Sequence, residues 1–212
     1  TESLAAVGIV TTFLSMLIWV LGQTRSAISS LVSQYLGANN LEAIKTLPAQ
    51  AILLITSLSV IIIILTYPFA EYIFKLYNAS NLILDYSIDY YQIRVFGFPF
   101  TLFTIAVFGT FRGLQNTFYP MIIAIVGTII NIILDVVLVY GVEGLIPAMH
   151  LKGAGYASVF AQLIMALLSI HYLLTKTPFS LKVIFPFNKE IKTFSLMILN
   201  LFVRTLALNV TL

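Results

Sequence analysis

Apolar residues fill six long stretches of this chain, and short polar connections separate the stretches. A helix needs about 20 largely apolar residues to cross the hydrocarbon core of a membrane. The stretches reach about that length or more, and they cover roughly residues 4–36, 48–69, 82–111, 120–140, 153–174 and 191–212. The pattern predicts an all-α, polytopic transmembrane helix bundle of about six helices.

Glycine and proline mark places where these helices should bend or approach a neighbour. Gly97 and Pro99 lie within the third stretch and predict a bend, because proline removes a backbone hydrogen bond. Gly109 and Gly113 allow either a close approach to another helix or a tight exit from the membrane. Residues 175–192 form the longest connection and are predicted to be a loop.

Basic residues gather in the connections after the first, third and fifth stretches. Those connections hold Lys45, Arg112, Lys176, Lys182, Lys189 and Lys192, whereas the opposite side holds Lys75, Lys152 and Arg204. Connections rich in lysine and arginine stay on the cytoplasmic side of a membrane. We therefore expect the first stretch to run from outside to inside. On the outer side, residues 142–152 are predicted to form an interfacial loop or a short amphipathic helix.

The composition agrees with a membrane protein and excludes several functional classes. Hydrophobic residues make up 60% of the chain and charged residues 9%, and the mean hydropathy is +1.03. Soluble domains carry about 25% charged residues. The absence of cysteine excludes thiol catalysis, and a net charge of +3 is too small to indicate binding to nucleic acid. No motif for nucleotide binding or hydrolysis occurs, so we do not expect an enzyme.

Asp135 is the single acid in the apolar run 121–140. A carboxylate at membrane depth costs roughly 2.5–3.5 kcal/mol, and such residues usually face a bundle interior or wet cavity and handle ions or protons. Asn131 precedes it by one helical turn, Gly127 extends the same face, and Thr128 lies beside that glycine. This polar stripe favours transport over a plain membrane anchor.

Each polar residue also has a simpler interpretation. Asp135 could pair with Arg94 or Arg25, because a buried charge requires a partner. Asn131 could join two helices by a hydrogen bond. The remaining polar side chains fall into two groups. Four serines at helical spacing are predicted to pack against another helix: Ser26, Ser29, Ser30 and Ser33. Three acids are predicted to be solvated loop charges near the outer surface: Glu71, Asp85 and Asp89.

Five short motifs occur in a fixed order along the chain. They are ESLAAVG at 2–8, SQYLGANN at 33–40, FRGLQNT at 111–117, NIILD at 131–135 and GAGYAS at 153–158. Together they resemble the multidrug and toxic compound extrusion (MATE) family of secondary transporters, and specifically its DinF-like branch. The resemblance covers essentially the whole chain, as helices two to six and most of helix seven of that family.

The resemblance implies a twelve-helix antiporter with two six-helix lobes, of which residues 1–212 form a single partial N-lobe domain. We expect a fragment whose partners include the second lobe and the family's first helix, which carries another functional aspartate. Asp135 and Asn131 match the acid and amide of the family's N-lobe cation site, a candidate Na⁺ site. Ser158 replaces the usual threonine and keeps its hydroxyl. With Thr128, these residues complete the predicted ion- or proton-coupling set.

We therefore predict an antiporter that exports small organic cations or amphipathic compounds in exchange for H⁺ or Na⁺, without a further cofactor, in a bacterial inner membrane. Loss of water disfavours a charged carboxylate and a nearby cation favours it, so changing access to Asp135 could load and release a proton. One alternative is a lipid-linked oligosaccharide flippase, which should have a more cationic cavity; only Arg25 and Arg94 approach membrane depth. Another is a structural membrane subunit, in which Asp135 merely pairs with a neighbour.

Overall fold

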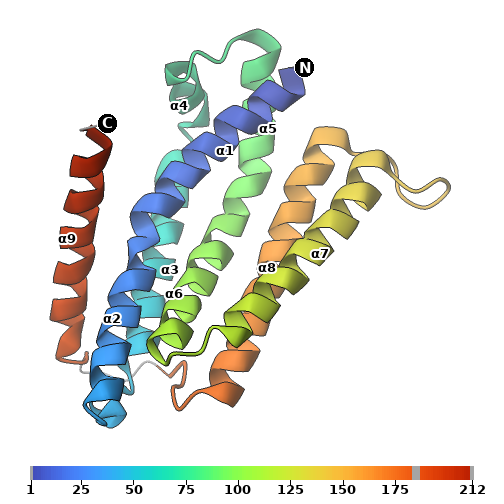
Figure 1. Ribbon diagram of the computed structural model, residues 1–212. Coiled ribbons are helices and arrows are strands. Elements are labelled where there is room, and N and C mark those ends of the chain that lie inside the picture. Colours follow the sequence, from blue (N-terminus) through green and yellow to red (C-terminus); the bar gives the residue numbers. More distant parts are fainter. Residues whose placement is uncertain (1, 183–186, 211–212) are drawn as a thin grey trace. The chain divides into compact units, whose positions relative to one another are not determined.

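The computed structural model describes residues 2–182 and 187–210, and the predicted all-α fold is confirmed (Figure 1). Within these residues the α-helices are α1 (Glu2–Leu21), α2 (Gln23–Gly37), α3 (Leu47–Thr66), α4 (Ala70–Leu76), α5 (Asn81–Arg94), α6 (Phe98–Gly113), α7 (Phe118–Tyr140), α8 (His150–Lys176) and α9 (Glu190–Val210). Two short 3₁₀ helices, η1 (Leu41–Ile44) and η2 (Val95–Gly97), lie between them.

Five helical stretches in the described part are long and apolar enough to cross a membrane. They are Glu2–Gly37, Leu41–Thr66, Asn81–Gly113, Phe118–Tyr140 and His150–Lys176. These stretches correspond to the first five predicted ones, so the chain is an integral membrane protein with several apolar spans. The sixth predicted stretch contains α9, and its role as a span stays a prediction.

Three of the long stretches are interrupted. Leu41–Thr66 consists of η1 and α3, and the other two breaks lie within predicted apolar stretches, where only one was expected. The bend expected at Gly97 and Pro99 is confirmed, since the 3₁₀ turn of η2 separates α5 from α6 there. A second break separates α1 from α2 at Gly22, whose N–H still donates to the Ile18 carbonyl over 2.7 Å. Glycine is a weak helix former, but the break is a single turn residue, which the hydrophobic pattern does not reveal.

The connections also differ in detail from the expectation. The 141–149 segment is a turn closed by a bridge between Val142 and Ile146, and α8 begins directly after it at His150. Of the two predicted alternatives, the loop is therefore the correct one. The short helix α4 was not predicted; it packs on α5 (Figure 1). The expected loop after α8 is confirmed at 177–182 and 187–189, while 183–186 lie outside the described residues.

The chain divides into two compact units, which we describe separately. The first unit comprises Thr1–Leu17, Leu58–Thr101 and Ala124–Met165, and the second unit comprises Ile18–Ser57, Leu102–Ile123 and Ala166–Leu212. The interpretation of the whole chain as a single partial N-lobe domain stays a prediction.

An aromatic cluster forms the core of the first unit. The rings of Phe13, Phe74 and Tyr91 meet edge to face, with centroids 5.3–6.0 Å apart. Such pairs contribute about 0.5–1.5 kcal/mol beyond the burial of their area. The Tyr91 hydroxyl also hydrogen-bonds the Thr66 hydroxyl at 2.5 Å. These contacts join α1, α3, α4 and α5 within the first unit.

Polar contacts fix the start of α9 in the second unit. The Tyr35 hydroxyl donates to Glu190 Oε1 over 3.0 Å, which joins α2 to α9. Asn188 lies just before α9, and its side-chain amide donates to the Ala43 carbonyl over 2.8 Å. Its backbone N–H donates to Gln50 Oε1, also over 2.8 Å.

Candidate functional site

Asn131 and Asp135 lie on the same side of α7, and we call them the α7 polar pair. Both side chains are half-buried. The other side of the helix is apolar and exposed, as expected of a surface in contact with lipid, and it comprises Ile125, Ile129, Ile132, Ile133 and Val136. The helix therefore turns its two interior polar groups away from its most exposed apolar surface.

Two glycines bring α7 and α8 together along the side that carries the pair. A Cβ at Gly127 would collide with the Met165 side chain, and one at Gly153 would collide with the Leu138 carbonyl. Gly127, the α7 polar pair and Leu138 follow one another at spacings of four, four and three residues, so they share one stripe of the helix. The pair therefore lies on the stripe of α7 along which α8 packs.

The same two contacts fix the register between the helices and place Ser158. Because Leu138 meets Gly153 and Gly127 meets Met165, the helices run antiparallel. Counting residues along the two antiparallel helices from either contact places Ser158 level with the turn of α7 between Asn131 and Asp135. Its side chain is half-buried. The structure thus brings three of the four predicted coupling residues to about the same level along α7 and α8.

The α7 polar pair has unused bonding capacity. The Asn131 Nδ2 atom is buried and has no hydrogen-bond partner among the described residues. No hydrogen bond or ion pair reaches Asp135 from that part of the chain. The fourth predicted residue, Thr128, is exposed and its hydroxyl donates to the Ala124 carbonyl over 2.9 Å. A buried polar group without a partner costs about 1–3 kcal/mol, so the Asn131 amide can accept a further partner at little cost.

Pairing of Asp135 with Arg94 was the alternative to ion coupling, and no salt bridge joins the two, since their charged groups are more than 4.0 Å apart. Arg94 still acts on the carboxylate electrostatically. Its guanidinium Nη1 donates instead to the side-chain oxygen of Gln162, over 3.1 Å. This arrangement requires the Gln162 amide to turn its oxygen towards Arg94 and its nitrogen towards the Gly97 carbonyl, the orientation that satisfies the surrounding donors and acceptors.

Gln162 holds the break between α5 and α6. Its amide nitrogen donates to the Gly97 carbonyl over 3.3 Å, and its oxygen also accepts from the Thr101 hydroxyl over 3.1 Å. A side chain at position 97 would collide with this amide, which explains why glycine occupies the break. Gln162 was not among the predicted site residues, although its amide stands in the middle of an apolar helix.

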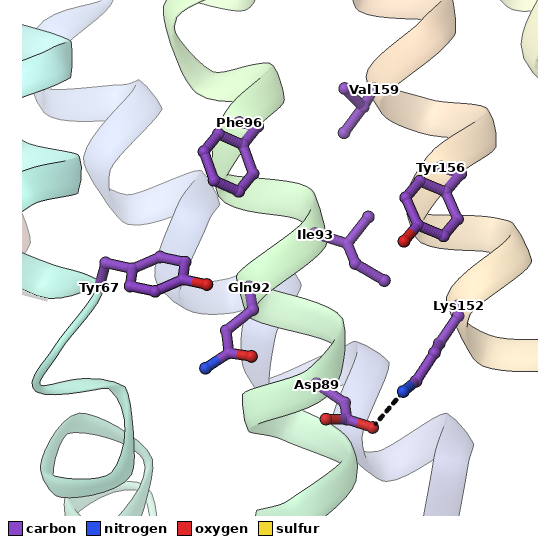
Figure 2. Close-up of a pocket in the computed structure, with 8 residues that line it drawn as sticks. All are labelled: Tyr67, Asp89, Gln92, Ile93, Phe96, Lys152, Tyr156 and Val159. Atoms are coloured by element: carbon purple, nitrogen blue, oxygen red, sulfur yellow. Dashed lines mark ion pairs between the residues drawn. The ribbon is translucent and has the colours of Figure 1, made fainter.

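A pocket of about 420 Å³ lies in the first unit (Figure 2). It is lined by Tyr67, Asp89, Gln92, Ile93, Phe96, Lys152, Tyr156 and Val159. Lys152 Nζ lies 2.9 Å from Asp89 Oδ2, and both side chains are about half exposed. Asp89 is therefore a half-exposed charge in an ion pair. Glu71 lies on α4 and Asp85 and Asp89 lie on α5, so these acids are helical residues rather than the predicted loop charges. An exposed pair of this kind contributes at most about 1 kcal/mol, and neither residue of the α7 polar pair lines the pocket.

The arrangement at α7 and α8 is chemically suited to a proton or a small hard cation. One carboxylate, one amide and one hydroxyl provide oxygen atoms that can coordinate Na⁺, and the carboxylate can also bind a proton. Within the described residues, no group of three histidine, cysteine, aspartate or glutamate side chains could hold a metal ion. A transition-metal centre is therefore not indicated in that part of the chain.

Comparison with known proteins gives the relationships of the chain. The MatE family model matches residues 1–137. DNA damage-inducible protein F of Escherichia coli (strain K12) is 31% identical over 152 residues, which cover 72% of this chain and 31% of that protein. Multidrug resistance protein MdtK of Edwardsiella ictaluri (strain 93-146) is 31% identical over 146 residues, which cover 69% and 32%. The chain thus spans about a third of the length of these curated relatives.

A crystal structure of MATE in the bent conformation has the same fold, with a TM-score of 0.89 at 21% identity. The superposition covers 99% of this chain and 47% of that one. The family match covers more than half of the chain and includes the α7 polar pair, but it ends before Ser158. The chain belongs to the MatE family.

Proposed function

We propose that the chain forms part of the N-lobe of a secondary antiporter that exports small organic cations or amphipathic compounds in exchange for H⁺ or Na⁺. The observation that carries this proposal is the α7 polar pair, which faces α8 without a partner among the described residues. Membership of the MatE family supports it. The proposal concerns the full-length protein in its bilayer, including a first helix and a second lobe.

In the proposed mechanism, the two lobes of the protein rock around a central cavity and expose the site to each side in turn. Asp135 binds the coupling ion from the outside and releases it to the inside. With Na⁺, Asn131 and Ser158 contribute neutral oxygens beside the carboxylate. The register of α7 against α8 supports this role for Ser158. Thr128 contributes least, because its hydroxyl proton already bonds the Ala124 carbonyl.

The proposed substrate class comes from the relatives. The protein MdtK of Edwardsiella ictaluri is described as a multidrug resistance protein, which supports export of chemically varied compounds here. Both relatives described above are bacterial, which supports location in a bacterial inner membrane.

The test measures transport of a fluorescent cationic dye in inverted membrane vesicles that contain the full-length protein. Asp135→Asn should abolish transport driven by the coupling gradient while the protein level stays normal. The reason is that a neutral amide neither takes up and releases a proton nor supplies a negative charge for Na⁺. Asp89→Asn is the matched control, since it removes a carboxylate from a half-exposed ion pair. Separate pH and Na⁺ gradients identify the ion. Undiminished transport by Asp135→Asn would refute the coupling role.

A further inference from the structure

Two arginines from neighbouring helices line one pocket of the second unit. Arg25 lies on α2 and Arg112 lies in the last turn of α6. The pocket has a volume of about 270 Å³, and its remaining lining residues are Ser26, Ser29 and Ser30. All five residues carry side chains that donate hydrogen bonds.

Glycine contacts fix the two helices that carry these arginines. A Cβ at Gly109 would lie 2.7 Å from the Arg25 carbonyl oxygen, and one at Gly113 would lie 2.9 Å from that of Ser29. Glycines four residues apart let two membrane helices approach closely, so the predicted close approach is confirmed. Because Arg112 immediately precedes Gly113, its backbone is held at the level of Ser29. The pocket therefore rests on a fixed backbone.

Neither arginine has an acidic partner in the part of the second unit that the structure describes. Its acids are engaged elsewhere: Glu42 pairs with Lys45 at 3.2 Å, and Glu190 accepts from Tyr35. Two guanidinium groups that share a pocket repel each other, and more strongly where the effective dielectric constant is low. A convergent pair of unneutralised arginines is suited to an anion, which each can bind through two parallel hydrogen bonds.

The serines add neutral donors to the same pocket. Ser30 Oγ accepts from Gln34 Nε2 over 3.3 Å, so its own proton remains available. The Ser26 and Ser29 hydroxyls have no hydrogen-bond partner among the described residues. The predicted role of this serine face was helix packing, and three of its four members also line the pocket. Two arginines with hydroxyl donors match the several acceptor oxygens of a phosphate group.

We propose that this Arg25–Arg112 pocket binds a phosphate group, carried either by an anionic lipid or by a soluble organic phosphate. Arg112 lies at the end of α6 that the distribution of basic residues predicts to be cytoplasmic, whereas Arg25 lies in the first turn of α2, further into the predicted span. The pocket uses helices other than those of the α7 polar pair, and it does not depend on the exported compound or the coupling ion. Its arginine side chains select anions, whereas the α7 polar pair selects a cation.

The test uses the full-length protein in detergent and two probes. Native mass spectrometry counts retained phosphatidylglycerol, with phosphatidylcholine as the neutral-headgroup control, and calorimetric titration measures binding of inorganic phosphate. The wild type should bind at least one probe. Arg25→Gln with Arg112→Gln should weaken that binding about ten-fold or more, because two charge-assisted contacts are lost. Binding of phosphatidylglycerol alone identifies a lipid source, and binding of inorganic phosphate a soluble one.

Two control variants separate the pocket from general charge effects. Arg25→Lys with Arg112→Lys keeps the charges and should retain part of the binding. Lys182→Gln removes an exposed lysine of the same predicted side but outside the pocket, and it should bind like the wild type. If the double glutamine variant does not fold, each single variant replaces it. Binding of neither probe, equal binding by the glutamine variants and the wild type, or an equal loss in Lys182→Gln would refute the site.

Discussion

Replacing Gln162 by leucine should destabilise the protein by about 2 kcal/mol. The substitution roughly keeps the side-chain volume but removes the amide that bonds Arg94, Gly97 and Thr101. Hydrogen bonds between membrane helices contribute about 0.6 kcal/mol on average and about 1.7 kcal/mol at most. The charge-assisted bond to Arg94 takes the upper value, and the bond to the Gly97 carbonyl takes the average. Thr101 loses little, since its hydroxyl lies 3.1 Å from the Gly97 carbonyl and can donate there.

Reversible unfolding of the full-length protein in mixed micelles measures this difference. Gln92→Leu provides the matched control, because Gln92 is also a half-buried helical amide but has no hydrogen-bond partner in the described part of the chain. The control should change the free energy of unfolding by less than about 0.5 kcal/mol, as is usual away from bonded networks. Equal effects of the two substitutions would show that the Gln162 network is not formed.

The same variant should also change the pH dependence of transport. Arg94 acts electrostatically on Asp135, and its position is held by Gln162. Freeing the guanidinium group alters the field at the carboxylate, so the pH at which transport is half-maximal should move. Gln92→Leu should leave the profile in place. A purely structural role for Gln162 would lower the amount of folded protein without moving the profile.

Two further predictions concern α7 and α8. Gly153→Ala should destabilise the protein by about 1–3 kcal/mol, because the new Cβ meets the rigid Leu138 carbonyl. Gly8→Ala is the control and should not destabilise it, since a Cβ there meets nothing within 4 Å. Thermal unfolding compares the two variants, and equal melting temperatures would contradict the close packing of α7 on α8. Asn131→Leu should leave the free energy of unfolding unchanged or raise it, because it removes a buried donor without a partner. The same variant should transport less dye. A large loss of stability with normal transport would show that Asn131 is structural.

The helices could be predicted from sequence because their signal is long and local. Stretches of about 20 apolar residues leave few alternatives in a membrane, and Pro99 marks a break wherever the helix packs. Gly22 carries no such signal, since glycine is tolerated within a helix as well as at a break. The short helix α4 was missed because seven residues give too little periodicity for a pattern to be recognised.

The candidate site was only partly visible in the sequence. Asp135 stands out because a single charge in an apolar run is costly wherever it packs. The level of Ser158 relative to the α7 polar pair depends on the register between α7 and α8, which two glycine contacts determine. The role of Gln162 was hidden, because its amide bonds groups more than 60 positions away along the chain. Such partners become apparent only when the helices are packed.

The glycine contacts between α7 and α8 limit how this part of the protein can move. At Gly153 the neighbouring surface is main chain, which cannot change rotamer to make room as a side chain can. The contact at Gly127 lies about one turn from Asn131 and holds the other end of the interface. The parts of α7 and α8 between these two contacts should therefore move together, with the α7 polar pair between them. Any hinge that opens the site must lie in the segments that flank this helical hairpin rather than within it.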